Sequence, residues 1–264
     1  MRRKKIMVVG FIAYTAKTGL QRNYQKKRCR KASAPRFSGR SVSVKDSSAM
    51  TPARFNRINS VLTRRQPDLT VVMENVHKPH NLAAIARSCD AVGINEVHAI
   101  PYSEEIAIDQ KASVGCERWV ALKTHETVDD AFSHLRKRGF KILATHFSDD
   151  AVSFRDVDFT GPTAIVVGAE MDGVFPETVD AADGTIIVPM MGMVQSLNVS
   201  VATALILFEA QRQREAAGLY DRCLLDADTV DRLRFEWAHP KIAPIYNRKG
   251  EPYPDLDEAG NLIL

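Results

Sequence analysis

The sequence predicts an α/β protein built around a parallel β-sheet with helices on both faces. Strand-like runs of Val, Ile and Leu alternate with helix-like segments through residues 50–264, and the strand-like runs are continuously apolar. Strands that are apolar on both sides are buried on both faces, which is typical of a parallel sheet covered by helices. The 264 residues, 45% of them hydrophobic, are enough for one large domain or two modest ones.

A helix is predicted to begin just after Met50. Thr51 is a good N-cap residue, and Pro52 suits the first helical position. Apolar residues then recur at helical spacing and form one stripe: Phe55, Ile58, Val61 and Leu62. Basic residues are predicted on the opposite, polar side of this helix: Arg54, Arg57, Arg64 and Arg65.

Strands and helices then alternate as far as residue 220. The predicted strands are Leu69–Met73, Glu96–Ile100, Val120–Leu122, Lys141–Ala144, Ala164–Val167 and Ile186–Val188. The predicted helices, each followed closely by a glycine that can end it, are Asn81–Ala91, Val128–Lys137 and Asn198–Ala216. A last helix, at about Ala227–Trp237, leads into a polar tail. The predicted organisation is an extension over 1–49, an N-terminal helix over 50–68, an α/β domain over 69–220, and a C-terminal helix and tail over 221–264.

The net charge of +4 hides a strong asymmetry. Residues 1–49 contain fourteen Lys and Arg and one acidic residue, whereas residues 50–264 contain 22 basic and 31 acidic residues. We interpret residues 1–49 as a disordered basic arm or an over-extended translation start. A signal or transit segment is the alternative, although the apolar run is short and no convincing cleavage site follows it. If the acidic body binds nucleic acid, it must do so through local basic clusters.

The cysteines and the apolar runs exclude several classes of protein. Four cysteines are scattered without a C-x-x-C pair: Cys29, Cys89, Cys116 and Cys223. This spacing indicates a reducing compartment such as the cytoplasm and no disulfide framework. No apolar run approaches the roughly 18 residues of a membrane span, so no membrane partner is predicted.

Two segments that follow predicted strands carry polar residues. In the first, residues 77–87, Asn81 and Arg87 considered alone are an N-cap and a solvated side chain, and the H-x-x-H pair lacks a third ligand, so no metal is predicted. In the second, residues 166–174, glycines bracket a turn that holds Glu170, and they would let the backbone approach a ligand. The second segment is neither a dinucleotide fingerprint nor a P-loop.

The third and most informative segment is residues 189–209. It begins as a Met-rich loop after a strand and ends as an apolar helix, with Gln195, Ser196 and Asn198 grouped at the helix start. A helix cap requires only one of these side chains. The turn also exposes backbone N–H groups at the carboxyl end of a parallel strand, where α/β sheets bind ligands. The segment is therefore predicted to belong to a binding site.

In order and spacing, the three segments resemble the motif series of the SPOUT (SpoU-type) RNA 2'-O-methyltransferases. The motifs are N-x-x-A-I-x-R, G-A-E-x-x-G and I-V-P-M-x-G-x-V-x-S-L-N-V-S-V-A. The similarity extends from residue 50 to about residue 255 and is greatest to the bacterial tRNA (guanosine-2'-O)-methyltransferase branch, the TrmH type. Residues 64–70, 76–81, 143–146 and 209–213 also look like this branch.

The resemblance implies a fold, a cofactor and an assembly. The family fold is a parallel α/β sheet with a C-terminal trefoil knot, and its members act as homodimers with the active site near the subunit interface. The cofactor is S-adenosylmethionine, which an apolar slot with backbone hydrogen bonds can hold. Matching positions in this chain are implied to line that slot: Thr145, Gly168, Val188 and Leu197.

The resemblance also implies the reaction and its residues. A methyl group is transferred to the ribose 2'-oxygen of guanosine 18 in the D-loop of tRNA. Arg87 is the implied catalytic residue, and it is supported by Asn81, Glu170, Ser196 and Asn198. Family members are proposed to use this arginine as a base, but a guanidinium stays protonated in proteins, so stabilising the developing charge or clamping a phosphate is the alternative.

For an acidic body, the RNA contact is predicted at the first helix, through Arg54, Arg57, Arg64 and Arg65. Two other functions remain open. A 2'-O-methyltransferase that acts on ribosomal RNA shares the catalytic motifs. A non-catalytic knotted RNA-binding protein would be expected to lack Arg87 or Asn198, and both are present.

Overall fold

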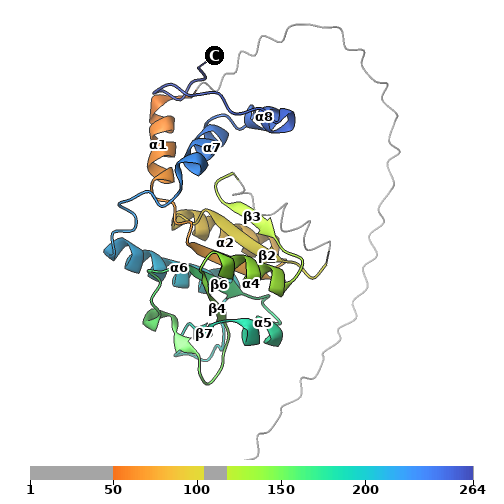
Figure 1. Ribbon diagram of the computed structural model, residues 1–264. Coiled ribbons are helices and arrows are strands. Elements are labelled where there is room, and N and C mark those ends of the chain that lie inside the picture. The colour runs from red at the N-terminus through yellow and green to blue at the C-terminus, as the bar shows by residue number, and fades with distance from the viewer. Residues whose placement is uncertain (1–49, 104–117, 264) are drawn as a thin grey trace, which may run out of the picture. The chain divides into compact units, whose positions relative to one another are not determined.

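Seven parallel strands form the centre of the protein in a computed structural model, which describes residues 50–103 and 118–263 (Figure 1). The predictions for residues 1–49 therefore lie outside the described residues. The strands are β1 Leu69–Glu74, β2 Glu96–Ile100, β3 Ala121–Thr124, β4 Lys141–Thr145, β5 Val152–Ser153, β6 Thr163–Val167 and β7 Gly184–Ile187. The order across the sheet is β3-β2-β1-β6-β4-β7-β5, and all neighbouring strands pair in parallel. The predicted fold class is confirmed as a parallel sheet flanked by helices.

The helices of the described part are α1 Pro52–Leu62, α2 Pro79–Ala91, α4 Val128–Lys137, α5 Pro176–Ala181, α6 Val199–Ala216, α7 Ala227–Ala238 and α8 Ala243–Lys249, with a 3₁₀ turn at Phe154–Asp156. Helix α4 has the predicted bounds, and its N-cap Thr127 accepts a hydrogen bond from the Asp130 amide. Helix α6 begins where predicted, with Asn198 as N-cap. No helix of the described residues is long and apolar enough to cross a membrane.

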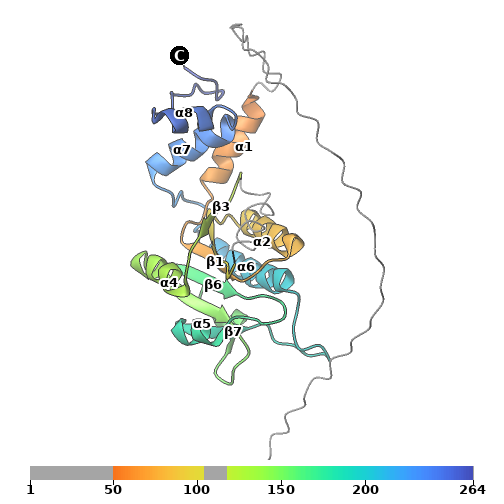
Figure 2. The same ribbon diagram turned by 90° about the vertical axis from the view of Figure 1, so that its right-hand side faces the viewer.

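Helices cover both faces of the sheet (Figure 2). Helices α2 and α6 pack on one face, where Val71 and Met73 of β1 join a large apolar cluster. Helix α4 packs on the other face, where Val72 joins the second cluster. Side chains alternate across a strand, so a continuously apolar strand supplies both cores. Fully burying one such side chain contributes roughly 1.5–3 kcal/mol.

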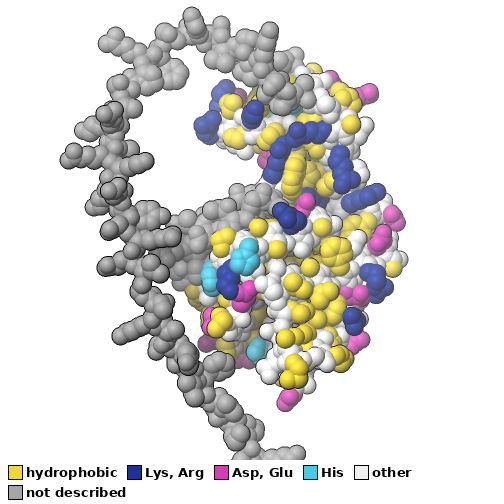
Figure 3. Space-filling model, turned by 180° about the vertical axis from the view of Figure 1, so that it is seen from behind, with side chains coloured by type: hydrophobic (Ala, Val, Ile, Leu, Met, Phe, Trp, Pro, Cys, Tyr) yellow, Lys and Arg dark blue, Asp and Glu magenta, His cyan; other side chains and the backbone are white. Residues whose placement is uncertain are grey.

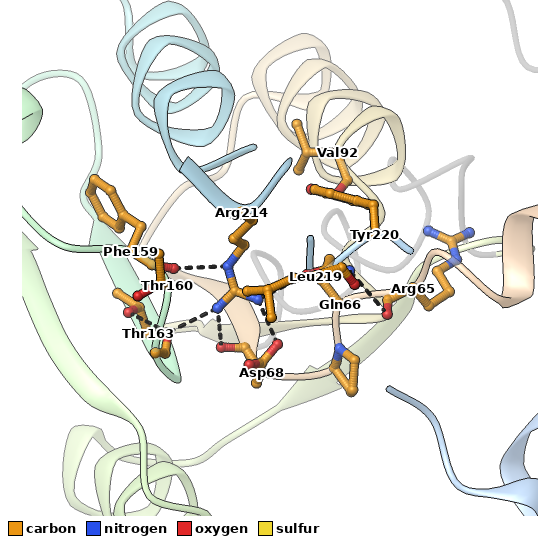
Figure 4. Close-up of polar contacts among 12 residues, drawn as sticks. Arg65, Gln66, Asp68, Val92, Phe159, Thr160, Thr163, Arg214, Leu219 and Tyr220 are labelled. Carbon is orange, nitrogen blue, oxygen red and sulfur yellow. Dashed lines mark hydrogen bonds and ion pairs between the residues drawn. The ribbon is translucent and has the colours of Figure 1, made fainter. Parts of the chain in front are cut away.

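A buried arginine joins the end of α6 to the amino-terminal edge of the sheet (Figure 4). The Arg214 side chain has no exposed surface. Its guanidinium donates to the Asp68 carboxylate at 2.6 Å and to the Gln66 side-chain carbonyl at 3.0 Å. It also donates to the backbone carbonyls of Phe159 and Gly161, at 2.9 and 2.8 Å. We call this set, Arg214 with Gln66, Asp68, Phe159 and Gly161, the Arg214 network. It gives a buried charge the partners that it requires.

Helices α1 and α7 pack against each other through a separate apolar cluster. Phe55 and Leu62 of α1 contact Trp237 and other residues of α7 there, as the predicted stripe requires. The tail after α8 returns to α1. Gly260 lies so close to the Phe55 ring that a Cβ added there would be only 2.5 Å from it. The N-terminal helix and the C-terminal segment are thus parts of one helical layer.

Several details differ from the sequence predictions. Arg65 is not on a polar surface: it is fully buried and donates to Asp90, Ile94 and Trp119, because it lies beyond the end of α1, where the chain turns into the body. Asn81 is not an N-cap, because α2 begins two residues earlier with Lys78 as its cap. The polar tail contains α8, and the short elements β5 and α5 were not predicted. Two to seven residues are too few to give a periodic signal.

Candidate active site

The loops that carry the predicted site residues meet at one edge of the sheet. Strands β1, β6, β4 and β7 are consecutive neighbours, and all are parallel, so their carboxyl ends lie side by side. The loop after β1 leads into α2, and the loop after β7 leads into α6. These two helices cover the same face of the sheet, which is the face seen in Figure 3. The site is therefore built from four loops on a rigid base.

Three of the predicted residues contact one another. The Asn81 amide donates to the Glu170 carboxylate at 2.9 Å, and the Asn198 amide donates to the same oxygen at 2.6 Å. The Asn198 amide also donates to the Asn81 side-chain carbonyl at 3.1 Å. Asn81 is 2% exposed, whereas Glu170 and Asn198 are exposed residues. One carboxylate thus joins the loops after β1, β6 and β7.

Asn198 also determines where α6 begins. Its side-chain carbonyl accepts from the Ser200 backbone N–H at 2.9 Å and from the Ser200 hydroxyl at 2.6 Å. The amide donors of the same side chain bond Glu170 and Asn81. A single residue therefore caps the helix and fixes the direction in which the helix leaves the site.

Lys78 completes this group and was missed by the sequence analysis. Its ammonium forms an ion pair with the second oxygen of the Glu170 carboxylate. Its signal was its place in the segment that contains Asn81, directly after the predicted strand. We call Lys78, Asn81, Glu170 and Asn198 the Glu170 network. The first three line a shallow pocket of about 30 Å³, together with Val76 and Met171.

Arg87 and Ser196 do not join the Glu170 network. Arg87 is exposed on α2, and its side chain has no hydrogen bond or ion pair within residues 50–103 and 118–263. Ser196 is also exposed, and its hydroxyl has no partner in the same part of the chain.

Three of the four predicted cofactor residues lie at the ends of adjacent strands, and the fourth, Leu197, is a partly buried residue of the loop just before α6. Thr145 ends β4, and its hydroxyl donates to the Val166 carbonyl of β6 at 2.9 Å. Gly168 follows β6, while Val188 follows β7 and is partly buried against the core. A Cβ on Gly168 would lie 1.8 Å from the Gly173 carbonyl oxygen, so the shape of this turn itself requires glycine.

Large apolar side chains around these loops are exposed. They are Phe147, Met171, Met191, Met193 and Val194, with Met191 and Met193 95% and 99% exposed. Helix α6 adds a stripe of Val201, Leu205 and Phe208, which lie three to four residues apart on one face. Hydrophobic side chains form a broad patch over this part of the face in Figure 3. A patch of this kind marks a surface that binds a ligand or another protein.

Basic groups on the first helix and just beyond its end face solvent. Arg54 and Arg57 of α1 and Arg64, which follows α1, are exposed, unlike Arg65, so the prediction that Arg64 lies on the helix is corrected. Arg118, whose guanidinium donates to the Trp237 carbonyl of α7, is exposed nearby. Burial, and then the charge of Arg54, lower the pKa of the Arg118 guanidinium. Like charges gathered at a surface are suited to bind an anion such as a phosphate.

Comparison with known proteins shows which family has this sequence. The sequence model of the SpoU rRNA methylase family matches residues 68–208, and that of the SpoU rRNA methylase C-terminal segment matches residues 212–264. A tRNA (guanosine(18)-2'-O)-methyltransferase of Escherichia coli K12 is 51% identical over 215 residues, which are 81% of this chain and 94% of that protein.

Comparison with solved structures also finds SpoU-type enzymes. A tRNA-modifying enzyme of Aquifex aeolicus, TrmH/SpoU, superposes with a TM-score of 0.65 at 42% identity, and covers 72% of this chain and 97% of its own. The SpoU methyltransferase AviRb of Streptomyces viridochromogenes, solved in complex with the cofactor AdoMet, superposes with a TM-score of 0.51 at 25% identity. That match covers 59% of this chain and 61% of AviRb.

Proposed function

The chain belongs to the SpoU methylase family, and we propose that it methylates the 2'-oxygen of guanosine 18 in the D-loop of tRNA with S-adenosylmethionine. The observation that carries the proposal is the similarity to the E. coli tRNA (guanosine(18)-2'-O)-methyltransferase. The two sequences are 51% identical over 94% of the E. coli protein. The Glu170 network at the carboxyl ends of β1 and β6 supports it, because the three motifs meet there.

The cofactor residues fit S-adenosylmethionine. Partly buried apolar groups are supplied by Val188 at the end of β7 and by Leu197 just before α6, and Gly168 forms the tight turn after β6. We propose that these residues and Thr145 hold the adenosine part through packing and backbone hydrogen bonds. When bound, the cofactor supplies an electrophilic methyl group on sulfur.

Arg87 is the proposed catalytic group. The 2'-hydroxyl must lose its proton, to water, when its oxygen accepts the methyl group, and partial negative charge develops on the oxygen as the O–H bond breaks. An exposed guanidinium with free N–H donors can stabilise that charge or clamp the neighbouring phosphate. A guanidinium stays protonated in proteins, so we assign Arg87 to charge stabilisation and not to proton removal. Removing such a donor from an active site costs about 10²–10³ in rate.

The Glu170 network is proposed to hold this site in shape. Its carboxylate is occupied by Lys78, Asn81 and Asn198, so its role is to fix three loops and not to take the proton. Ser196 is exposed beside Asn198 and is proposed to contact the target nucleoside. A preorganised site of this kind avoids reorganisation during the reaction.

We also propose a trefoil knot and a homodimer. The knot would be made by the segment between β7 and α6, which supplies both the cofactor residues and Asn198. The exposed stripe of α6 and the exposed methionines of the loop support a second copy as the partner, because that copy would cover them. Sedimentation of the purified protein would give a monomer mass if this assignment is wrong.

The tRNA is proposed to dock on the helical layer. Arg54, Arg57 and Arg64 are exposed there, and a phosphate backbone would neutralise their charge. We expect the protein in the cytoplasm with its substrate. Ribosomal RNA is the second candidate, because the family model that matches is named for it.

Methyl transfer from labelled cofactor separates these substrates. Purified protein is incubated with unmodified tRNA transcripts and, in parallel, with ribosomal RNA. Label in tRNA alone is the expected result. Label in ribosomal RNA alone would transfer the assignment to the second candidate, and label in neither would leave a non-catalytic RNA-binding protein.

A further inference from the structure

A cluster of three histidines lies away from the methyltransferase site. His98 is in the middle of β2, His125 follows β3, and His134 is on α4. The centres of the three rings are 5.1, 5.6 and 5.7 Å apart. Glu96 of β2 lies beside them, and one nitrogen or oxygen atom from each of Glu96, His98 and His134 lies within 4.8 Å of the others.

His98 has one ring nitrogen with a partner and one without. Its Nδ1 lies 2.9 Å from His125 Nε2, a hydrogen-bond distance between fully or nearly fully buried rings. Its Nε2 is buried and has no hydrogen-bond partner among the described residues. If Nδ1 carries the proton and donates to His125, the lone pair of Nε2 points toward Glu96 and His134. Metal-binding histidines are held in the same way, by a hydrogen bond from the nitrogen that does not bind the metal.

The separation of the ligand atoms fits a small tetrahedral ion. His98 Nε2 and Glu96 Oε1 are 3.6 Å apart, which is too long for a hydrogen bond. Two ligands about 2.1 Å from a tetrahedral zinc ion lie about 3.4 Å from each other.

Two cations border the cluster, and both must withdraw from His134 before an ion can bind. Arg138 Nη1 donates to Glu96 Oε1 at 2.9 Å and lies 3.4 Å from His134 Nε2. A ligating carboxylate commonly keeps a hydrogen bond of the first kind. Lys123 opposes an ion directly: its Nζ lies 3.2 and 3.3 Å from the two ring nitrogens of His134. An ammonium placed almost equally far from both nitrogens cannot align well with either lone pair, so its long side chain can leave at modest cost.

We propose that Glu96, His98 and His134 bind a zinc ion, with His125 as the residue that orients His98. Nitrogen and carboxylate ligands in a tetrahedral set favour zinc over magnesium or calcium. The fourth position is left to water. The ion would join α4 to the second strand of the sheet, so its role is to stabilise the fold, and methyl transfer does not require it.

Calorimetry on untagged protein, stripped with chelator and titrated with zinc chloride, tests the site. We expect one ion per chain and a higher midpoint of thermal unfolding with zinc. His134→Gln, at a half-exposed position, should weaken binding at least tenfold, and His98→Gln should do the same. Lys123→Met should tighten it, because a like charge is removed. His77→Gln/His80→Gln is the matched control and should leave binding unchanged.

Three results would overturn the site. The first is no heat and no thermal shift with zinc. The second is binding that persists in His134→Gln but is lost in the His77→Gln/His80→Gln control, which would locate the ion on the loop before α2. The third is a thermal shift with inorganic phosphate and none with zinc, which would make the cluster an anion site built on Lys123 and Arg138.

Discussion

The Arg214 network and the Glu170 network lie at opposite ends of the same sheet and are built from the same kinds of groups. Each joins segments that are distant in the sequence through an ion pair and side-chain amides. They differ in burial. Arg214 has no exposed surface and donates to carbonyl and carboxylate oxygens around its guanidinium. Glu170 and Asn198 are exposed, and Arg87 nearby has no partner in the described residues.

The difference separates stability from function. A buried charge that loses its partners is costly, so the Arg214 network can be changed only at the expense of the fold. In the Glu170 network only Asn81 is buried, so the partly exposed members Lys78, Glu170 and Asn198 each contribute less to stability. Arg87 and Ser196, outside the network, have side-chain groups with no partner among the described residues. Substitutions in the Arg214 network should therefore lower the unfolding free energy, whereas those around the Glu170 network should lower the rate of methyl transfer.

The largest effect is expected from Arg214→Met. It leaves the Asp68 carboxylate and several buried carbonyls without their donor, and should cost about 3–5 kcal/mol of unfolding free energy. Chemical denaturation measures it, with Arg212→Met as the control, because the Arg212 side chain is 66% exposed and, within residues 50–103 and 118–263, pairs with Glu209 alone. The control should lose about 0–1 kcal/mol. Equal losses of unfolding free energy in Arg214→Met and Arg212→Met would contradict the contrast between the buried network and the exposed surface.

Arg87→Ala should reduce turnover about 100-fold, which corresponds to about 2.7 kcal/mol of transition-state stabilisation. Its unfolding free energy should change by no more than about 0.5 kcal/mol, since the side chain is exposed. Single-turnover methyl transfer measures the loss of rate. Calorimetry with the cofactor measures cofactor affinity, which should be retained. A variant that keeps more than about a tenth of the rate would remove Arg87 from the central role.

Two substitutions of Asn198 separate its cap from its donors. Asn198→Ala removes both, and should cost about 1 kcal/mol of stability as well as activity. Asn198→Asp keeps the oxygen that caps α6, but it replaces the donors to Asn81 and Glu170 with a second negative charge. It should therefore keep the cap, lose some stability to repulsion from Glu170, and lose about tenfold in turnover. Full activity in Asn198→Asp would show that the Glu170 network is not needed for the reaction.

The smallest effect is expected from protein that begins at Met50. Both networks lie after this residue, so folding and turnover at saturating tRNA should be unchanged. The fourteen basic residues of 1–49 should tighten RNA binding only at low salt, because their contribution depends on counterion release. Filter binding at two salt concentrations, together with turnover at saturation, measures this. A truncated protein that folds but is inactive would place the segment in the enzyme.

The regular elements could be predicted from local pattern. The predicted bounds of α4, Val128–Lys137, are correct, and Asn198 gave the start of α6, because caps and periodicity act over a few residues. Arg65 could not be placed, since an arginine just beyond a helix has the same local signal whether it is buried or solvated. Its burial depends on Asp90 and Trp119, which come from other parts of the chain.

The contacts of the site could not be predicted from spacing. Asn81 and Glu170 are 89 residues apart, and Asn81 and Asn198 are 117 apart. Only the sheet order, with β6 between β1 and β4, brings them together. The resemblance to the SPOUT family assigned these three residues to one site but did not give the contacts between them. Lys78, which no motif singled out, was found only through its ion pair with Glu170.

The most direct test of the central claim, that this site methylates the 2'-oxygen of guanosine 18, uses two tRNAs that differ by one atom. One carries guanosine at position 18, and the other carries 2'-deoxyguanosine there. With labelled S-adenosylmethionine, the first should take up one methyl group per molecule and the second none, because the acceptor oxygen is absent. Equal label in both tRNAs, or no label in the first, would contradict the account.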